Sequence, residues 1–218
     1  MPITTILCDL DGTLVDSRAD IAPAFQHAWR TAIGGNPPTG SAISQHIGKP
    51  LIEMVSELGG TLHPAQRDAF LVSYRRAFVR QHAQLSRCYP EVLCTLRALS
   101  DLTLGVVTTK ESQQAEIVLQ RLALIRFFKH IQGASVDLRP KPAPDTIVAA
   151  LVALRCEPLH ALMVGDTAAD MLAGKAAGTL TCGVTYGFGA REALLASSPN
   201  FVIERFGQVV DLMRELRG

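Results

Sequence analysis

The sequence has no long hydrophobic run and no strong excess of one charge. Its longest apolar stretch, from Ile147 to Leu154, falls far short of the roughly 20 residues that a membrane-spanning helix needs. No basic segment followed by an apolar signal core opens the chain. With 21 basic and 20 acidic residues the formal net charge is +1, so the sequence indicates no basic surface for a nucleic acid. We therefore expect a cytoplasmic protein without a membrane or nucleic-acid partner.

Metal-binding patterns of cysteine and histidine are also absent. The five cysteines are an odd number without the spacing of a metal site, and Cys8 lies in a segment expected to be a buried strand. We interpret them as reduced thiols. None of the six histidines has a partner at metal-ligand spacing, so we assign them no chemical role.

Two kinds of hydrophobic pattern divide the chain. From Tyr89 onward, helix-period segments alternate with short β-rich runs, which is typical of βαβ units and a parallel sheet. In residues 16–84 the apolar residues recur at helical spacing, and no segment reads convincingly as a strand. We predict a Rossmann-like α/β core formed by residues 1–15 and 85–218, with residues 16–84 as an inserted all-helical cap domain over the strand ends.

Polar side chains with related chemistry follow the expected core strands. Four short apolar runs predict buried strands, at residues 5–8, 104–107, 130–132 and 161–164. After these runs, or in loops near them, come carboxylates, a hydroxyl and an ammonium: Asp9, Asp11, Thr108, Lys141, Asp166 and Asp170. Open α/β sheets place ligand sites at the carboxyl ends of parallel strands, so these groups can converge. Acids gathered beside one lysine need a further cation, and carboxylate oxygens favour Mg²⁺, so the pattern predicts a site for Mg²⁺ and phosphate.

Four segments occur in a fixed order along nearly the whole chain. They are DLDGTLVDS from Asp9, a threonine at Thr108, KPAPD from Lys141, and GDTAAD ending at Asp170. Together they resemble the haloacid dehalogenase superfamily, specifically its helical-capped, phosphoglycolate-phosphatase-like branch. The sequence departs from that branch at Glu91, where glycine is usual, and at Thr109, where asparagine is usual. The resemblance implies Mg²⁺-dependent hydrolysis of a phosphomonoester through an aspartyl-phosphate intermediate.

The chemistry of phosphoryl transfer agrees with this resemblance and gives the acidic residues their expected roles. Asp9 is the expected nucleophile, and Asp11 is expected to protonate the leaving oxygen and later to take a proton from water. The Asp9 carboxylate, the main-chain carbonyl of Asp11 and Asp166 are expected to hold Mg²⁺. Asp170 is expected to support the waters of the metal rather than to bind it directly.

Five further residues are expected at the substrate. Lys141 supplies a fixed positive charge, and the Thr108 hydroxyl donates a hydrogen bond to a phosphate oxygen. Gly12 lets the backbone turn tightly toward the phosphate. The resemblance places Thr109 at the phosphate pocket, and it places Lys49 in a cap loop that reaches toward the core, where it would meet a substrate anion.

The expected substrate is a small phosphorylated metabolite, with 2-phosphoglycolate as one candidate, because no basic groove for a polymer is indicated.

Three arginines on one expected helix, Arg75, Arg76 and Arg80, are interpreted as its solvated face. We expect a monomer or a homodimer.

Other functions use parts of the same pattern. A phosphomutase of this fold would use the same aspartates but return the phosphoryl group to a sugar hydroxyl. A haloacid dehalogenase is disfavoured because Asp11 has no role in displacing a halide from carbon. A non-enzymatic binding protein would be expected to have lost some of the chemical residues, and all of them are present.

Overall fold

The main sheet places the ends of its central strands at one site. The structure, a computed structural model, describes residues 2–81 and 83–217. Within them, six parallel strands lie in the order β5-β4-β1-β6-β7-β8. These strands are β1 (Thr5–Cys8), β4 (Thr103–Glu111), β5 (His130–Ala134), β6 (Ala161–Gly165), β7 (Leu180–Val184) and β8 (Phe201–Ile203). Strands β4 and β5 lie on one side of β1, and the later strands β6, β7 and β8 lie on the other. Open α/β sheets bind ligands at the point where the strand order reverses in this way.

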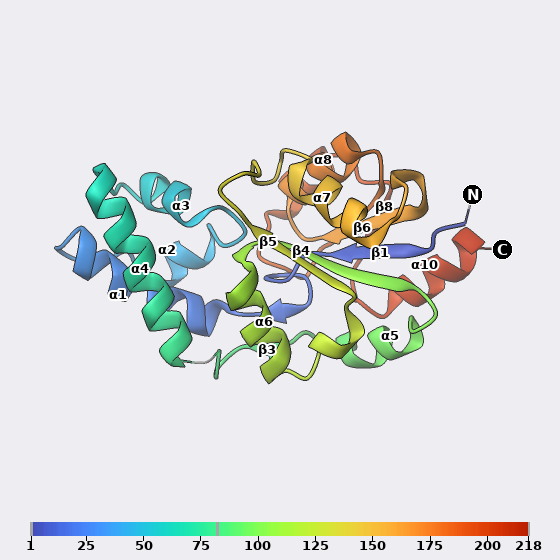
Figure 1. The fold of residues 1–218 in the computed structure, drawn as a ribbon, viewed down its shortest axis with the longest axis horizontal. Helices are drawn as coiled ribbons and strands as arrows, with labels where there is room; N and C mark the ends of the chain where they lie inside the picture. Colours follow the sequence, from blue (N-terminus) through green and yellow to red (C-terminus); the bar gives the residue numbers. More distant parts are fainter. Residues whose placement is uncertain (1, 82, 218) are drawn as a thin grey trace.

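Both faces of the sheet are buried, which explains why its strands read as apolar runs. All four residues of β1 are buried, and they alternate between two hydrophobic cores, with Ile6 in the larger core and Leu7 in the smaller one. Helices α5, α6 and α10 contribute to the larger core, and α7 and α8 contribute to the smaller one. Figure 1 shows these two groups of helices on opposite faces of the sheet.

The helices of this part are α5 (Val92–Ala98), α6 (Ser112–Arg121), α7 (Asp145–Leu154), α8 (Ala168–Ala177), α9 (Arg191–Ala196) and α10 (Gln208–Arg217). Two short 3-10 helices, η1 (Ile125–Phe127) and η2 (Pro158–His160), precede β5 and β6. Among the helices of residues 2–81 and 83–217, none combines the length and the apolar character that crossing a bilayer requires.

Four helices follow the first strand and lie together at one end of the molecule (Figure 1). They are α1 (Arg18–Ala32), α2 (Gly40–Ser44), α3 (Leu51–Glu57) and α4 (Pro64–Gln81). Helices α1 and α4 pack through aromatic side chains, with the ring centroids of Phe25 and Phe70 5.2 Å apart in an edge-to-face arrangement. Helix α1 ends just before Gly34, whose positive φ suits the turn after a helix. The predicted α/β core with an inserted helical segment is confirmed, and the domain boundaries stay a prediction.

The strands differ from the sequence expectation in several places, since β5 continues to Ala134 and the four expected runs do not include β7 or β8. Strand β4 continues past Val107, so Thr108 lies inside the strand and not after it. The pairing of β4 with β5 shifts register between Val107 and Glu111. The residues of this stretch are polar, so the sequence contains no apolar run that would predict the continuation of the strand. A short antiparallel pair, β2 (Val15–Asp16) and β3 (Arg87–Cys88), is not predicted by the sequence, because two residues are too few to show a period.

The buried carboxylate of Asp20 joins the two ends of the helical segment. Asp20 lies in the first turn of α1 and is fully buried. Its Oδ2 atom accepts hydrogen bonds from the backbone N–H of Leu85 at 3.1 Å and from both the N–H and the hydroxyl of Ser86 at 2.6 Å. One side chain therefore holds the chain leaving the helical segment against the chain entering it.

We predict that Asp20→Ala lowers the free energy of unfolding by about 2–4 kcal/mol, because it leaves buried donors without an acceptor. Urea unfolding followed by circular dichroism measures the change. The control is Asp68→Ala, which removes an exposed carboxylate from α4 and is expected to change stability by less than about 0.5 kcal/mol. Equal effects of the two substitutions would show that Asp20 does not hold this junction.

Candidate active site

The acidic loop after β1 begins the site. The backbone N–H of Asp9 donates to the carbonyl of Val164 at 2.9 Å, which ties the start of the loop to the end of β6. Gly12 has a φ of +95°, and its N–H donates to the carbonyl of Val15 at 2.9 Å. The loop therefore turns back on itself immediately beyond the sheet, and it keeps Asp9 and Asp11 at the carboxyl end of β1.

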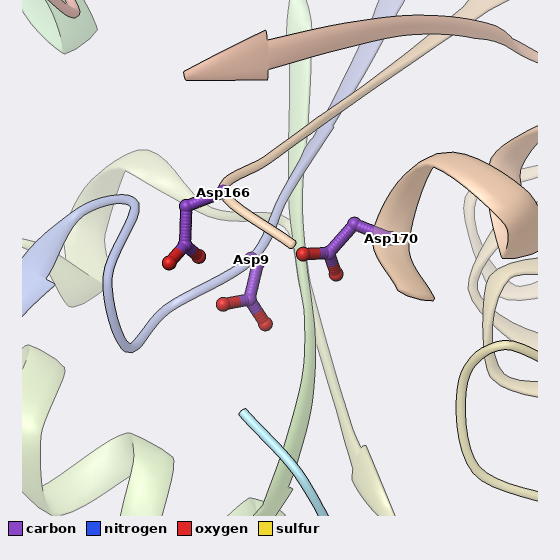
Figure 2. A group of neighbouring side chains, drawn as sticks. All are labelled: Asp9, Asp166 and Asp170. Carbon is purple, nitrogen blue, oxygen red and sulfur yellow. The ribbon is translucent and has the colours of Figure 1, made fainter. Parts of the chain in front are cut away.

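Three carboxylates from separate segments meet at this edge. Asp9 follows β1, Asp166 follows β6, and Asp170 lies in the first turn of α8. Their side chains face a common space in Figure 2, and one oxygen of each lies within 4.8 Å of the others. The three residues are only 4%, 1% and 1% exposed. Such close burial of like charges requires compensating positive charge.

Lys141 supplies part of that compensation. Its Nζ atom donates to Asp9 Oδ1 at 2.7 Å, to Asp170 Oδ1, and to the carbonyl oxygen of Val107 at 3.1 Å. These three acceptors satisfy the three N–H bonds of the ammonium. Burial lowers the pKa of Lys141, but the charges of Asp170 and Asp9 outweigh burial, so its pKa is raised and the ammonium stays charged.

The remaining charge fits a divalent cation. Three ionised carboxylates and one ammonium leave two negative charges in this buried space. Burial raises the pKa of Asp9, although the nearby charge of Lys141 acts in the opposite direction. The pKa of Asp166 is raised to about 6, mainly by burial and to a smaller extent by the charge of Asp170. A bound cation would favour the ionised form of each carboxyl. Oxygen-only donors of this charge suit Mg²⁺.

Backbone and hydroxyl donors fix the orientation of Asp166. Its Oδ2 atom accepts from the N–H groups of Phe188 at 2.7 Å and Gly189 at 3.0 Å, and its Oδ1 atom accepts from the Thr13 hydroxyl at 3.2 Å. A Cβ atom added at Gly12 would collide with the Asp166 carboxylate. The loop after β1 can therefore approach Asp166 closely because residue 12 has no side chain.

Asp11 has different partners from Asp9, although only one residue separates them. The Ser17 hydroxyl donates to Asp11 Oδ1, and Lys110 Nζ lies 3.2 Å from Asp11 Oδ2. Lys110 is also buried, with its ammonium 4.4 Å from the ring centroid of Phe78 on α4. The Asp11 side chain is therefore outside the carboxylate cluster, and its proposed metal contact concerns only its main-chain carbonyl.

The sequence interpretation gave no role to Lys110 or Ser17. Lys110 lies in the part of β4 beyond Val107, where the sequence gives no strand signal, so no period pointed to it. Serine is a common helix N-cap, so its place before a helix suggests a structural role for Ser17. It does occupy the position before α1, but its side chain makes no capping hydrogen bond and contacts Asp11 instead.

The hydroxyl of Thr108 is available to a ligand. Its Oγ1 atom accepts the backbone N–H of Lys110 at 3.2 Å, which leaves its own O–H free to donate. Thr108 and Lys141 both line a cavity of about 210 Å³, which also contains Thr146 in its wall. The Oγ1 atom of Thr146 is buried without a hydrogen-bond partner among the described residues.

A second, larger cavity of about 270 Å³ lies between the helical segment and the core. It shares Thr109 with the smaller cavity and also contains Asp11 and Lys49 in its wall. The ammonium of Lys49 lies 2.6 Å from both carboxylate oxygens of Glu57. The loop that contains Lys49 therefore lines this cavity, while the charge of Lys49 is already paired.

A model of the family described as haloacid dehalogenase-like hydrolase matches residues 6–184. The chain belongs to this family. A pyrophosphatase from Anoxybacillus flavithermus is 33% identical, covering 98% of each chain. A phosphoglycolate phosphatase from Vibrio vulnificus is 34% identical, covering 97% of this chain and 96% of the other. A solved haloacid dehalogenase-like hydrolase from Streptococcus pneumoniae is 29% identical, with a TM-score of 0.84 and coverage of 96% and 98%.

These comparisons confirm the family resemblance and the expectation of an enzyme. In this haloacid dehalogenase-like hydrolase Arg76 and Arg80 are exposed, as expected for a solvated face. The side chain of Arg75 is also 43% exposed, but its guanidinium binds both oxygens of Glu111 at the end of β4, with Nε 2.8 Å from Oε2. This contact crosses from α4 to the core, which a helix-surface pattern alone does not indicate.

We predict that Gly12→Ala weakens Mg²⁺ binding about a hundredfold, because the added methyl group would displace the Asp166 carboxylate. Isothermal titration calorimetry measures the affinity. Gly34→Ala is the matched control, since Gly34 also has a positive φ, of +85°, but has open space around it. We expect the control to lose about 1 kcal/mol of stability and to keep its Mg²⁺ affinity. Equal loss of affinity in both variants would rule out the close approach as the cause.

Proposed function

We propose that this protein is a Mg²⁺-dependent phosphatase that hydrolyses a small phosphomonoester through an aspartyl-phosphate intermediate. The observation that carries the proposal is the buried cluster of Asp9, Asp166 and Asp170 around Lys141, next to a cavity that contains Asp11. The phosphatase names of two relatives support it. The donor set would hold Mg²⁺ through Asp9, Asp166 and the carbonyl of Asp11, and the ion would offset the repulsion between Asp9 and a phosphate dianion.

In the first half of the proposed reaction, a carboxylate oxygen of Asp9 attacks phosphorus while the bond from phosphorus to the leaving oxygen breaks. Asp11 gives its proton to that oxygen, so the product leaves as a neutral alcohol. Lys141 holds Oδ1 of Asp9 and limits the rotation of the nucleophile. The Thr108 hydroxyl donates to a phosphate oxygen.

In the second half, water attacks the phosphorus of the aspartyl-phosphate. Asp11, now ionised, accepts a proton from this water, and the bond between phosphorus and Asp9 breaks to release inorganic phosphate. Lys110 and Ser17 each contact one oxygen of Asp11, and these contacts hold its carboxyl group in place through both steps. Each carboxyl group ends the cycle in the state in which it began.

A phosphomutase of the same fold is the alternative. It would form the same intermediate but transfer the phosphoryl group to a sugar hydroxyl. Free phosphate produced in proportion to the alcohol distinguishes the hydrolase from the mutase. The cavities hold no feature that favours the mutase, and the named relatives are described as phosphatases.

We expect Asp9→Asn to lower phosphate release by about a thousandfold or more, because the amide is nearly isosteric but cannot attack phosphorus. A phosphate-release assay measures the rate, and circular dichroism checks the fold. Asp211→Asn, which changes an exposed residue of α10, is the control and should keep full activity. Activity of more than a few per cent in Asp9→Asn would remove Asp9 from the nucleophile role.

We expect Asp166→Ala to raise the Mg²⁺ concentration for half-maximal activity about tenfold more than Asp170→Ala does, since only Asp166 is proposed to bind the ion directly. Activity should vanish with a chelator and return with Mg²⁺. Calorimetric titration of both variants with Mg²⁺ provides a measurement independent of turnover. Equal losses of affinity would mean that both carboxylates hold the metal.

A further inference from the structure

The two cavities contain different groups of the proposed reaction, and this difference orients a phosphomonoester. The smaller one contains Thr108, the proposed donor to a phosphate oxygen, and Lys141, which holds the proposed nucleophile Asp9. The larger one contains Asp11, which is the proposed proton donor to the leaving oxygen. A substrate with its phosphorus beside Asp9 would therefore extend its leaving group into the larger cavity.

The wall of the larger cavity is mainly aliphatic. The side chains come from the helical segment and include Ile21, Ile47, Ile52, Met54 and Leu71. A leaving group with a hydrocarbon surface gains about 25 cal/mol for each Å² of apolar area that it buries against such a wall. The volume of 270 Å³ equals roughly nine water molecules in the liquid. A body much smaller than a ring would leave part of this space unfilled.

The charged groups of this wall already have partners. Of the described residues that line the larger cavity, the basic ones are Lys49 and Lys110. Lys49 is bound to Glu57, and Lys110 is bound to Asp11. Glu111, the remaining acidic residue of the wall, is bound by Arg75. A carboxylate or a second phosphate on the leaving group would lose its water and would have to break an existing ion pair to be neutralised.

We propose that the larger cavity selects phosphomonoesters whose leaving group is uncharged and carries an apolar group at least the size of a benzene ring. This inference rests on the proposed phosphatase function and assigns its substrate class. It disfavours 2-phosphoglycolate and inorganic pyrophosphate, whose leaving groups are small anions. It also explains why the aliphatic wall belongs to the helical segment, since that segment covers the leaving group and not the phosphate.

The test compares benzyl phosphate with 2-phosphoglycolate and inorganic pyrophosphate at saturating Mg²⁺. Benzyl alcohol and glycolate are both aliphatic alcohols as leaving groups, so the comparison isolates charge and apolar surface. We expect kcat/KM for benzyl phosphate to exceed both other values by about tenfold or more. An equal or higher kcat/KM for either anionic substrate would overturn the inference.

A matched pair of variants locates the effect in the cavity. Leu71→Arg places a cation in the wall, whereas Val72→Arg places one at the next residue of α4, which is 40% exposed and does not line the cavity. We expect Leu71→Arg to lower kcat/KM for benzyl phosphate about tenfold and to shift the preference toward 2-phosphoglycolate, and Val72→Arg to change neither. Circular dichroism verifies the fold of both, and equal behaviour of the two variants would overturn the inference.

The outcomes separate this inference from the function on which it rests. Phosphate release that depends on Asp9 but favours an anionic substrate would refute the inference and leave the phosphatase proposal intact. Absence of Asp9-dependent release from all of these substrates and from a wider panel of phosphate esters would refute both.

Discussion

The ion pairs of one buried ammonium organise this site. Lys141 binds both Asp9, which lies 132 residues earlier in the chain, and Asp170, which lies 29 residues later. Removing one partner from such a buried pair typically costs about 3–5 kcal/mol, because the remaining charge is left without compensation. The ammonium therefore offsets part of the repulsion that would otherwise drive the carboxylates apart.

Asp170 shows how local structure supports that arrangement. Its Oδ2 atom accepts from the backbone N–H of Thr167 at 3.0 Å, and its own N–H donates to the Thr167 hydroxyl at 3.2 Å, which forms a capping box at the start of α8. The other oxygen binds Lys141. The positive end of the helix dipole also favours a carboxylate here. Asp170, which is expected to act near the metal, is thus held in place by the first turn of α8, the helix that follows β6.

The sequence predicts the parts of this structure that depend on local pattern and sheet topology. Apolar runs mark the central strands, and polar residues follow them because the carboxyl ends of parallel strands meet at one edge. Thr108 was placed after its strand because polar residues continue β4 without an apolar signal. The contacts of Arg75 with Glu111 and of Lys49 with Glu57 depend on how helices pack, and no periodicity in one segment specifies them.

The different partners of Asp9 and Asp11 separate two tasks of the proposed chemistry. Asp9 is fixed by Lys141, which belongs to the α/β core, while Asp11 contacts Ser17 at the start of α1 and Lys110, which packs on Phe78 of α4. The group that would attack phosphorus therefore depends on the sheet, and the group that would protonate the leaving oxygen depends also on the helical segment. The same segment supplies the aliphatic wall of the larger cavity, where we propose that the leaving group lies. Changes in these helices can thus alter which alcohol is released while the phosphoryl site stays the same.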